Sequence, residues 1–242
     1  QLYRVSPLGV IGIVFSGMAI GAIYAMGPVF ATEIGMPVKD VSFFMATIIL
    51  GGFLFQYPLG WLSDLIGRRK VILLSCIAGA GISAFAFHFS DRDIISYFVI
   101  ACVGGFSLPL YALCGVHIND YLNPTQMVAA SGTIVLLSSL GATIGSPLTA
   151  AAMDLFGLNA FYGSIAIMLT SIFIFSLWRT GKRPEFSTEE TGDFVPMHSS
   201  PMSASLNLDV TLNEIETAEN KDTEQIQDSF DELANDLESQ DR

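Results

Sequence analysis

Six long apolar runs, separated by short polar segments, divide the chain up to Trp178. The runs cover about residues 8–32, 41–62, 71–89, 94–116, 127–153 and 158–178. We expect the second run to be broken at Gly51-Gly52 and at Pro58. Each approaches or exceeds the roughly 20 apolar residues that a helix needs to cross a hydrocarbon core about 30 Å thick. The pattern therefore predicts an all-α membrane protein, with six transmembrane helices between residues 1 and 179.

Charge is concentrated in the C-terminal tail. Apolar residues make up 51% of the chain and charged residues only 14%, against about 25% charged in soluble domains. Residues 1–178 hold six Lys/Arg and seven Asp/Glu, whereas residues 179–242 hold five and sixteen. The net charge of -12 is therefore mainly that of the tail. Its low hydrophobicity and high charge predict a largely disordered cytoplasmic segment from 180 to 242, within which a marginal amphipathic helix at 226–237 is the alternative.

A short charged segment between the second and third runs carries the most specific motif. It resembles the loop signature of the major facilitator superfamily at Gly60, Leu62, Asp64, Gly67, Arg68 and Arg69. Family members usually have a cation directly after the aspartate, where this chain has Leu65. The resemblance implies a transporter with its cytoplasmic gate at this loop.

In that gate, Asp64 would accept hydrogen bonds at the N-terminus of a helix in a facing half of the transporter, where the helix dipole favours an anion. Arg68 and Arg69 would pair with carboxylates or lipid headgroups. The alternative is that the cations at 68–70 only anchor the loop on the cytoplasmic side.

An internal repeat relates the second run to the fifth. Pro58-Leu59 is followed by Asp64-Leu65-Ile66-Gly67, and Pro147-Leu148 is followed by Asp154-Leu155-Phe156-Gly157. Since each unit contains three helices, an odd number, the second unit must cross the membrane upside down. The sequence thus predicts two inverted three-helix repeats, and a chance recurrence of the two motifs at helix ends is the alternative. The resemblance implies the C-terminal half of a twelve-helix transporter whose N-terminal six-helix half is missing. The segment 117–157 also resembles a largely unassigned bacterial branch.

Polar residues within the runs are candidates for a solute pathway, because unpaired polar groups are costly in hydrocarbon. Tyr24, Gln56 and Tyr111 have the right depth, and the alternative for each is a hydrogen bond to a neighbouring helix. His117 and Asp120 are three residues apart, hence on one helix face, and are candidates for proton coupling. A solvated helix end is the simpler alternative for this pair.

Cation placement predicts the orientation, because cytoplasmic loops are enriched in Lys and Arg. With the 68–70 segment inside, both termini of the chain are cytoplasmic and the protein lies in the plasma (inner) membrane. The expected function is secondary transport of a small solute by alternating access, without a cofactor or nucleic acid. A non-transporting sensor or scaffold that signals through the acidic tail is the alternative. The apolar runs contain no catalytic or metal-binding motif, and Cys76, Cys102 and Cys114 are expected to be buried thiols.

Overall fold

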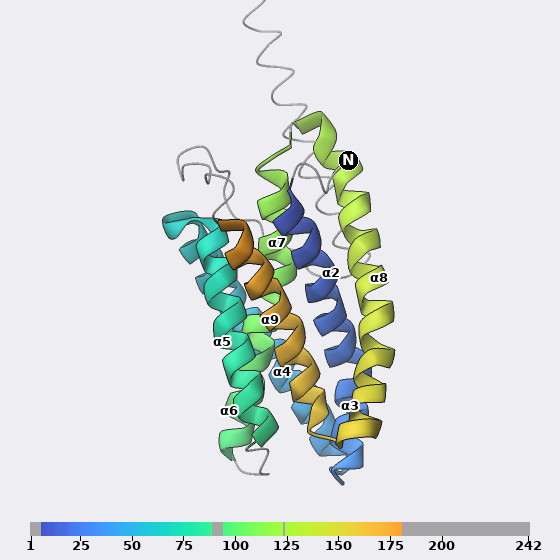
Figure 1. Ribbon diagram of the computed structural model, residues 1–242. Helices are drawn as coiled ribbons and strands as arrows, with labels where there is room; N and C mark the ends of the chain where they lie inside the picture. Colours follow the sequence, from blue (N-terminus) through green and yellow to red (C-terminus); the bar gives the residue numbers. More distant parts are fainter. Residues whose placement is uncertain (1–5, 89–93, 123, 181–242) are drawn as a thin grey trace, which may run out of the picture.

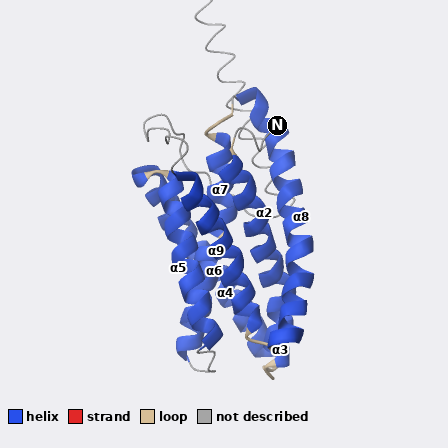
Figure 2. Ribbon diagram, in the orientation of Figure 1, coloured by secondary structure: helices blue, strands red, loops and turns tan. Residues whose placement is uncertain are grey.

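The computed structural model describes residues 6–88, 94–122 and 124–180, and these form helices joined by short turns (Figures 1 and 2). In chain order the elements are α2 (Pro7–Gly21), the π-helix η1 (Ala22–Met26), α3 (Gly27–Glu33), α4 (Val38–Ile66), α5 (Arg68–His88), α6 (Ile94–Ser107), α7 (Pro109–Asn119), α8 (Pro124–Phe156) and α9 (Ala160–Thr180). The tail from 181 onward, including the possible helix at 226–237, lies outside the described residues.

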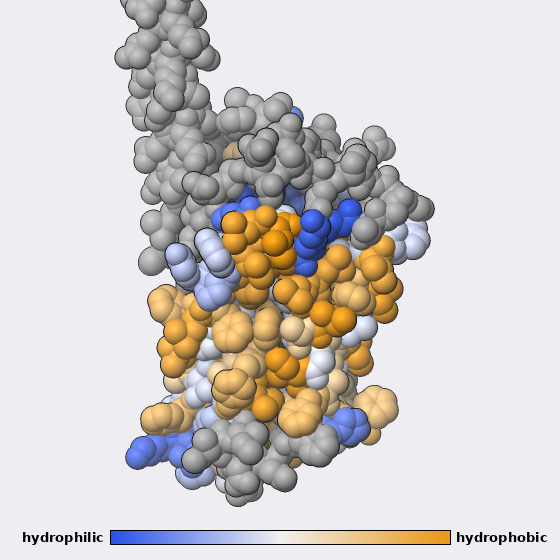
Figure 3. Space-filling view, turned by 90° about the vertical axis from the view of Figure 1, so that its left-hand side faces the viewer, coloured by the Kyte–Doolittle hydropathy of each residue, from blue (hydrophilic) through white to orange (hydrophobic). Residues whose placement is uncertain are grey.

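Six spans in the described residues are long and apolar enough to cross a membrane. α2, η1 and α3 together form the first span, and α6 with α7 forms the fourth. The face shown in Figure 3 carries apolar side chains across its middle and hydrophilic ones toward both ends, as expected of a protein surrounded by lipid. The predicted all-α fold with six membrane-spanning helices is confirmed.

The helices run up and down in one bundle (Figure 1). The start of α2, the α4–α5 turn and the end of α9 lie at one end of the bundle, and the α3–α4 and α8–α9 turns lie at the other. The closest helix pairs are α2 with α8, α4 with α6, and α5 with α9. The first and fourth spans are mostly buried, whereas only a minority of the residues of α4 and α8 are buried. The first and fourth spans therefore form the interior of the bundle.

Glycines allow α2 and α8 to approach until backbone meets backbone. A Cβ added at Gly17 would overlap the carbonyl of Ser138, and one at Gly141 would overlap the carbonyl of Val14. Small residues at helix contacts are the usual device in membranes, where close packing takes the place of a hydrophobic driving force.

The α4–α6 contact is built from the corresponding residues of the other repeat. A Cβ added at Gly104 would overlap the carbonyl of Ile48, and one at Gly51 would overlap the carbonyl of Ala101. In the repeat, α6 takes the place of α2, and α4 takes the place of α8. The two interfaces therefore match residue by residue, and the inverted repeat predicted from two short motifs extends to the packing of the first and fourth spans.

Helix boundaries differ from the predictions at three points. Gly51-Gly52 and Pro58 do not break the second span, since α4 is one helix from Val38 to Ile66. Instead, the fourth span is interrupted at Leu108, just before Pro109. The charged segment is also less of a loop than expected, because only Gly67 separates α4 from α5 and the cations begin α5.

Candidate gate and solute pathway

Gly67 makes the turn between α4 and α5 possible. Its φ is 95° and its ψ is 137°, a conformation that is nearly restricted to glycine. Its backbone N–H donates to the carbonyl of Ser63 over 3.1 Å and so closes the end of α4. Because the turn is a single residue, Asp64 in the last turn of α4 lies beside Arg68 in the first turn of α5.

Arg68 lies at the centre of a charged cluster that joins three helices. Its Nε is 2.8 Å from Oδ2 of Asp120 at the end of α7, and its Nη2 is 3.8 Å from Oδ1 of Asp64. The Arg68 side chain is 2% exposed, that of Asp120 9% and that of Asp64 34%. The pair with Asp120 is therefore the shorter and the more buried of the two.

Electrostatics explains why the cluster needs these anions. Three consecutive cations begin α5, where the helix dipole disfavours positive charge. A buried guanidinium also costs several kcal/mol of hydration unless it is paired. Asp64 and Asp120 offset both costs for Arg68, and they do so by connecting α5 to α4 and α7.

Arg69 connects α5 to a fourth helix. Its Nη2 donates to the carbonyl of Ser176, 3.1 Å away in the last turns of α9. A cation near a helix C-terminus is favoured by the dipole, and the side chain is buried. Together, Arg68 and Arg69 hold the ends of α4, α5, α7 and α9 at one side of the membrane.

Asp120 differs from an ordinary surface carboxylate. Burial raises the pKa of Asp120, Arg68 opposes this rise and Asp64 adds to it, and the result is a pKa of about 6. The proton can therefore be exchanged close to neutral pH. Binding a proton would remove the negative charge that Arg68 faces at the shorter distance.

His117 lies in the last turns of α7 and is buried. Its ring packs edge-on against Tyr121, with centroids 5.2 Å apart. It lies within electrostatic reach of both Arg68 and Arg69. Asp120 thus belongs to the same charged cluster as the predicted gate and His117 lies beside it, although the sequence analysis predicted the pair and the gate as separate sites.

Two of the candidate pathway residues, the tyrosines, occupy irregular parts of their helices. Tyr24 is in the π-helix η1 and is 44% exposed, whereas Tyr111 follows the interruption at Leu108 and is buried. Gln56 is buried two residues before Pro58. Phe55, next to it, packs on Phe106 with ring centroids 4.9 Å apart, just before the interruption in the fourth span. Irregular membrane helices are typical of solute sites in transporters.

Sequence reasoning missed two features of this arrangement. It did not pair Arg68 with Asp120, because nothing local links residues so far apart in the chain. It also did not notice that Ile23-Tyr24-Ala25-Met26 recurs as Leu110-Tyr111-Ala112-Leu113, which places the two tyrosines at corresponding positions of the two repeats. That second signal was available in the sequence.

Among the described residues, no group of three or more His, Cys, Asp or Glu side chains is placed to hold a metal ion. Cys76, Cys102 and Cys114 are all buried free thiols, as expected.

A family model described as Major Facilitator Superfamily matches residues 9–215. The chain belongs to the major facilitator superfamily. Proteins of this family are transporters and not enzymes. The prediction of a transporter rather than an enzyme is therefore confirmed. The family that the resemblance at 60–69 indicated is therefore confirmed.

Two relatives within the superfamily are bacterial. The chain is 26% identical over 188 residues to an uncharacterized MFS-type transporter, Ent638_1421, of Enterobacter sp. (strain 638), covering 75% of this chain and 46% of the relative. It is 26% identical over 189 residues to the uncharacterized MFS-type transporter YcaD of Escherichia coli O17:K52:H18, covering 75% and 47%. The chain thus spans about half the length of these relatives.

Two solved transporter structures share the fold of this chain. The POT family transporter PepTSo superposes with a TM-score of 0.66 at 13% identity, covering 76% of this chain and 39% of that one. The human organic anion transporter MFSD10 (TETRAN) gives a TM-score of 0.54 at 24% identity, covering 79% and 50%. This chain therefore corresponds to about half of the MFSD10 structure and to less than half of the PepTSo structure.

Proposed function

We propose that this chain is the C-terminal six-helix half of a secondary transporter that moves a small solute by alternating access, with its cytoplasmic gate at the Arg68 cluster. The cluster comprises Asp64, Arg68, Arg69 and Asp120. The observation that carries the proposal is the buried Arg68, paired with carboxylates from two other helices at one end of the bundle. Family membership supplies the reaction class.

Such a cluster suits a gate because its contacts join separate helices and are few. Arg68 joins α5 to α4 and α7, and Arg69 joins α5 to α9. Charged pairs between helices can separate and re-form without unfolding either helix. In this proposal the cluster is intact when the cytoplasmic side is closed, and a helix end of the other half contacts Asp64, whose side chain is about one third exposed.

The solute would pass along Tyr24, Gln56 and Tyr111, and the two tyrosines lie where their helices are irregular. Proton coupling would involve Asp120, with His117 beside it. The missing N-terminal half would complete the other wall of the path. The lengths of the relatives, of which this chain covers 46% and 47%, support a partner of that kind.

Transport by the full-length protein is the decisive experiment. Proteoliposomes with and without a pH gradient would be screened with labelled solutes, and the Asp64→Asn variant would be compared with the parent. We expect saturable uptake by the parent and slower uptake by the variant, at equal expression and thermal stability. A cysteine at Tyr24 should also change its accessibility in the variant. Unchanged uptake and accessibility would remove Asp64 from the gate, and no uptake of any solute would favour the sensor or scaffold.

Orientation in the inner membrane is tested separately by cysteine labelling of intact cells. Because the cations at 68–70 are proposed to be cytoplasmic, a cysteine at Lys39 should react with an impermeant reagent from outside and one at Lys70 should not. The opposite pattern would reverse the gate to the outer side.

A further inference from the structure

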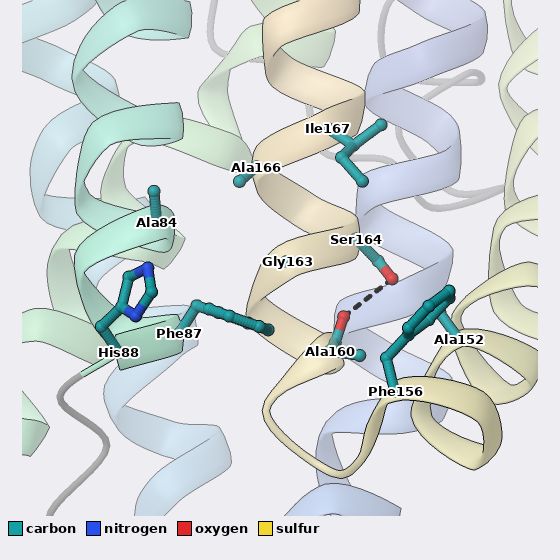
Figure 4. Close-up of a pocket in the computed structure, with 10 residues that line it drawn as sticks. All are labelled: Ala84, Phe87, His88, Ala152, Phe156, Ala160, Gly163, Ser164, Ala166 and Ile167. Carbon is teal, nitrogen blue, oxygen red and sulfur yellow. Dashed lines mark hydrogen bonds between the residues drawn. The ribbon is translucent and has the colours of Figure 1, made fainter.

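A pocket of about 420 Å³ lies between α5, α8 and α9, at the ends of these helices that are remote from Arg68 (Figure 4). Small residues leave the space: Ala84 from α5, Ala152 from α8, and Ala160, Gly163 and Ala166 from α9. Three of them recur along one side of α9, so the hollow follows the helix axis rather than crossing it.

Two aromatic rings border the pocket. Phe87 projects from α5 toward α9, and Phe156 lies at the end of α8 (Figure 4). The Phe87 ring lies next to Gly163, where an added Cβ would come within 3.2 Å of it. Phe87 is also fixed through its backbone, since its carbonyl accepts a hydrogen bond of 3.1 Å from the Asn159 side chain. These contacts hold Phe87 against α9 and so fix one wall of the pocket.

The lining offers almost nothing to a polar ligand. The hydroxyl of Ser164 donates to the carbonyl of Ala160 over 2.8 Å within α9, as drawn in Figure 4. The other polar side chain is His88, the last residue of α5. A ligand with several hydrogen-bonding groups would leave them unpaired here, at a cost of about 1–3 kcal/mol each.

The pocket is continuous with the surface that faces the bilayer. All of its lining residues belong to membrane spans. Two of them, Phe156 and Ile167, are 77% and 69% exposed and belong to the apolar outer surface. In a membrane, hydrocarbon chains are the molecules that reach such a surface.

From these observations we propose that the pocket is a binding site for one acyl chain of a phospholipid, held between α5, α8 and α9 in the leaflet remote from Arg68. The chain would lie along α9 with dispersion contacts on three sides, which a lipid against a smooth helix face does not make. Its headgroup would lie at the end of the pocket near His88. The site does not depend on transport.

The test uses the purified full-length protein in lipid nanodiscs with a trace of phosphatidylethanolamine that carries a photoactivatable diazirine in its acyl chain. After irradiation, labelled residues are located by mass spectrometry. We expect labelling at 84–88 and 160–167 to exceed several-fold that at Ile174, which is on α9 and exposed but outside the pocket. Excess unlabelled phosphatidylethanolamine should abolish this difference.

Variants that fill the pocket provide the second measurement. Ala84→Leu and Ala166→Leu add bulk inside it, and Ala151→Leu adds the same bulk on α8 at an exposed position outside it. The first two should lose the excess labelling and the third should keep it, with all three eluting as folded protein. If a filled variant does not fold, the labelling map of the parent chain decides.

Three results would overturn the site. Labelling that is even over the outer surface means ordinary surrounding lipid. Excess labelling that persists in folded filled variants places the lipid elsewhere. Displacement by free palmitate, with none by phosphatidylethanolamine, means a fatty-acid site instead.

Discussion

The two helix turns that correspond in the inverted repeat share their backbone but not their charges. At the α4–α5 turn Gly67 has φ 95°, and at the α8–α9 turn Gly157 has φ 89°. Each glycine N–H donates to the carbonyl four residues earlier, Ser63 at 3.1 Å and Met153 at 3.0 Å. An aspartate precedes each glycine by three residues, Asp64 and Asp154.

The hydrogen bond that joins α5 to α9 at each turn is also repeated. Arg69 donates to a carbonyl near the end of α9, and Asn159, its counterpart, donates to a carbonyl near the end of α5. Arg68, however, is matched by Leu158. The glycine and the cross-helix hydrogen bond therefore belong to the fold, and the ionic cluster is what distinguishes the end that we assign to the gate.

The largest effect should follow from making the first turn like the second. Arg68→Leu would leave Asp120 buried without its cation, and removing one partner of a buried pair costs about 3–5 kcal/mol. We expect a clear fall in the thermal unfolding temperature in detergent. Asp120→Asn added to Arg68→Leu should restore much of the loss. The control is Leu158→Met, a size-conserving apolar change at the other turn that should cost less than about 1.5 kcal/mol. An Arg68→Leu variant as stable as the parent would mean that the cluster contributes no stability.

Gly67→Ala and Gly157→Ala should both destabilise, by a smaller and similar amount. Positive φ costs a residue with a Cβ about 1–2 kcal/mol. At Gly157 nothing lies within 4 Å of an added Cβ, so the backbone alone sets the cost there. The free energy of unfolding of each variant is the measurement. If only Gly67→Ala were destabilised, the two turns would not be equivalent.

Acid should tighten the first turn and leave the second unchanged. Burial raises the pKa of Asp120 from its ordinary value of 3.8 to about 6. When the turn opens, Asp120 reaches water and its pKa returns toward the ordinary value, so the closed turn binds a proton more strongly than the open one. Lowering the pH from 7.5 to 5 therefore favours the closed turn, and hydrogen exchange at 64–71, corrected for intrinsic rates, should fall relative to that at 154–161.

Matched variants identify the responsible group. Asp120→Asn should remove the pH dependence, because no carboxyl remains to titrate at that position. His117→Gln should keep the pH dependence. That result would show that the carboxyl of Asp120, and not the imidazole of His117, is responsible for it. If the pH dependence remained in Asp120→Asn, a group other than Asp120 would be responsible for it.

Local patterns explain which parts of the fold could be predicted. The six spans follow from the length of the apolar runs, and the turn at Gly67 follows from a glycine between two apolar helices. The interruption at Leu108 was not predicted, and Pro58, which was expected to break α4, lies within it. Proline breaks a membrane helix or is accommodated depending on whether neighbouring helices satisfy the freed backbone, and that is a tertiary property.

The sequence predicted the residues of the candidate site but not the contacts between them. Asp64, Arg68 and Arg69 were recognised from a local motif, and Asp120 was noted only for its spacing from His117. The Arg68–Asp120 pair depends on α7 ending beside the start of α5, and the Arg69–Ser176 contact depends on α9 packing against α5. Those arrangements are set by the packing of four helices and not by any segment alone.

The smallest effect should come from Asn159→Ala, which removes the uncharged counterpart of the Arg69 contact. A neutral hydrogen bond contributes about 0.5–1.5 kcal/mol, and Asn159 is exposed, so water can replace the lost donor at the Phe87 carbonyl. Arg69→Ala should cost more, because it removes a buried charge-assisted donor from the α9 end. The difference between the two unfolding free energies measures what charge adds to a contact whose geometry the repeat already provides. Equal losses would show that the hydrogen bond matters at both turns and that the charge of Arg69 adds nothing to stability.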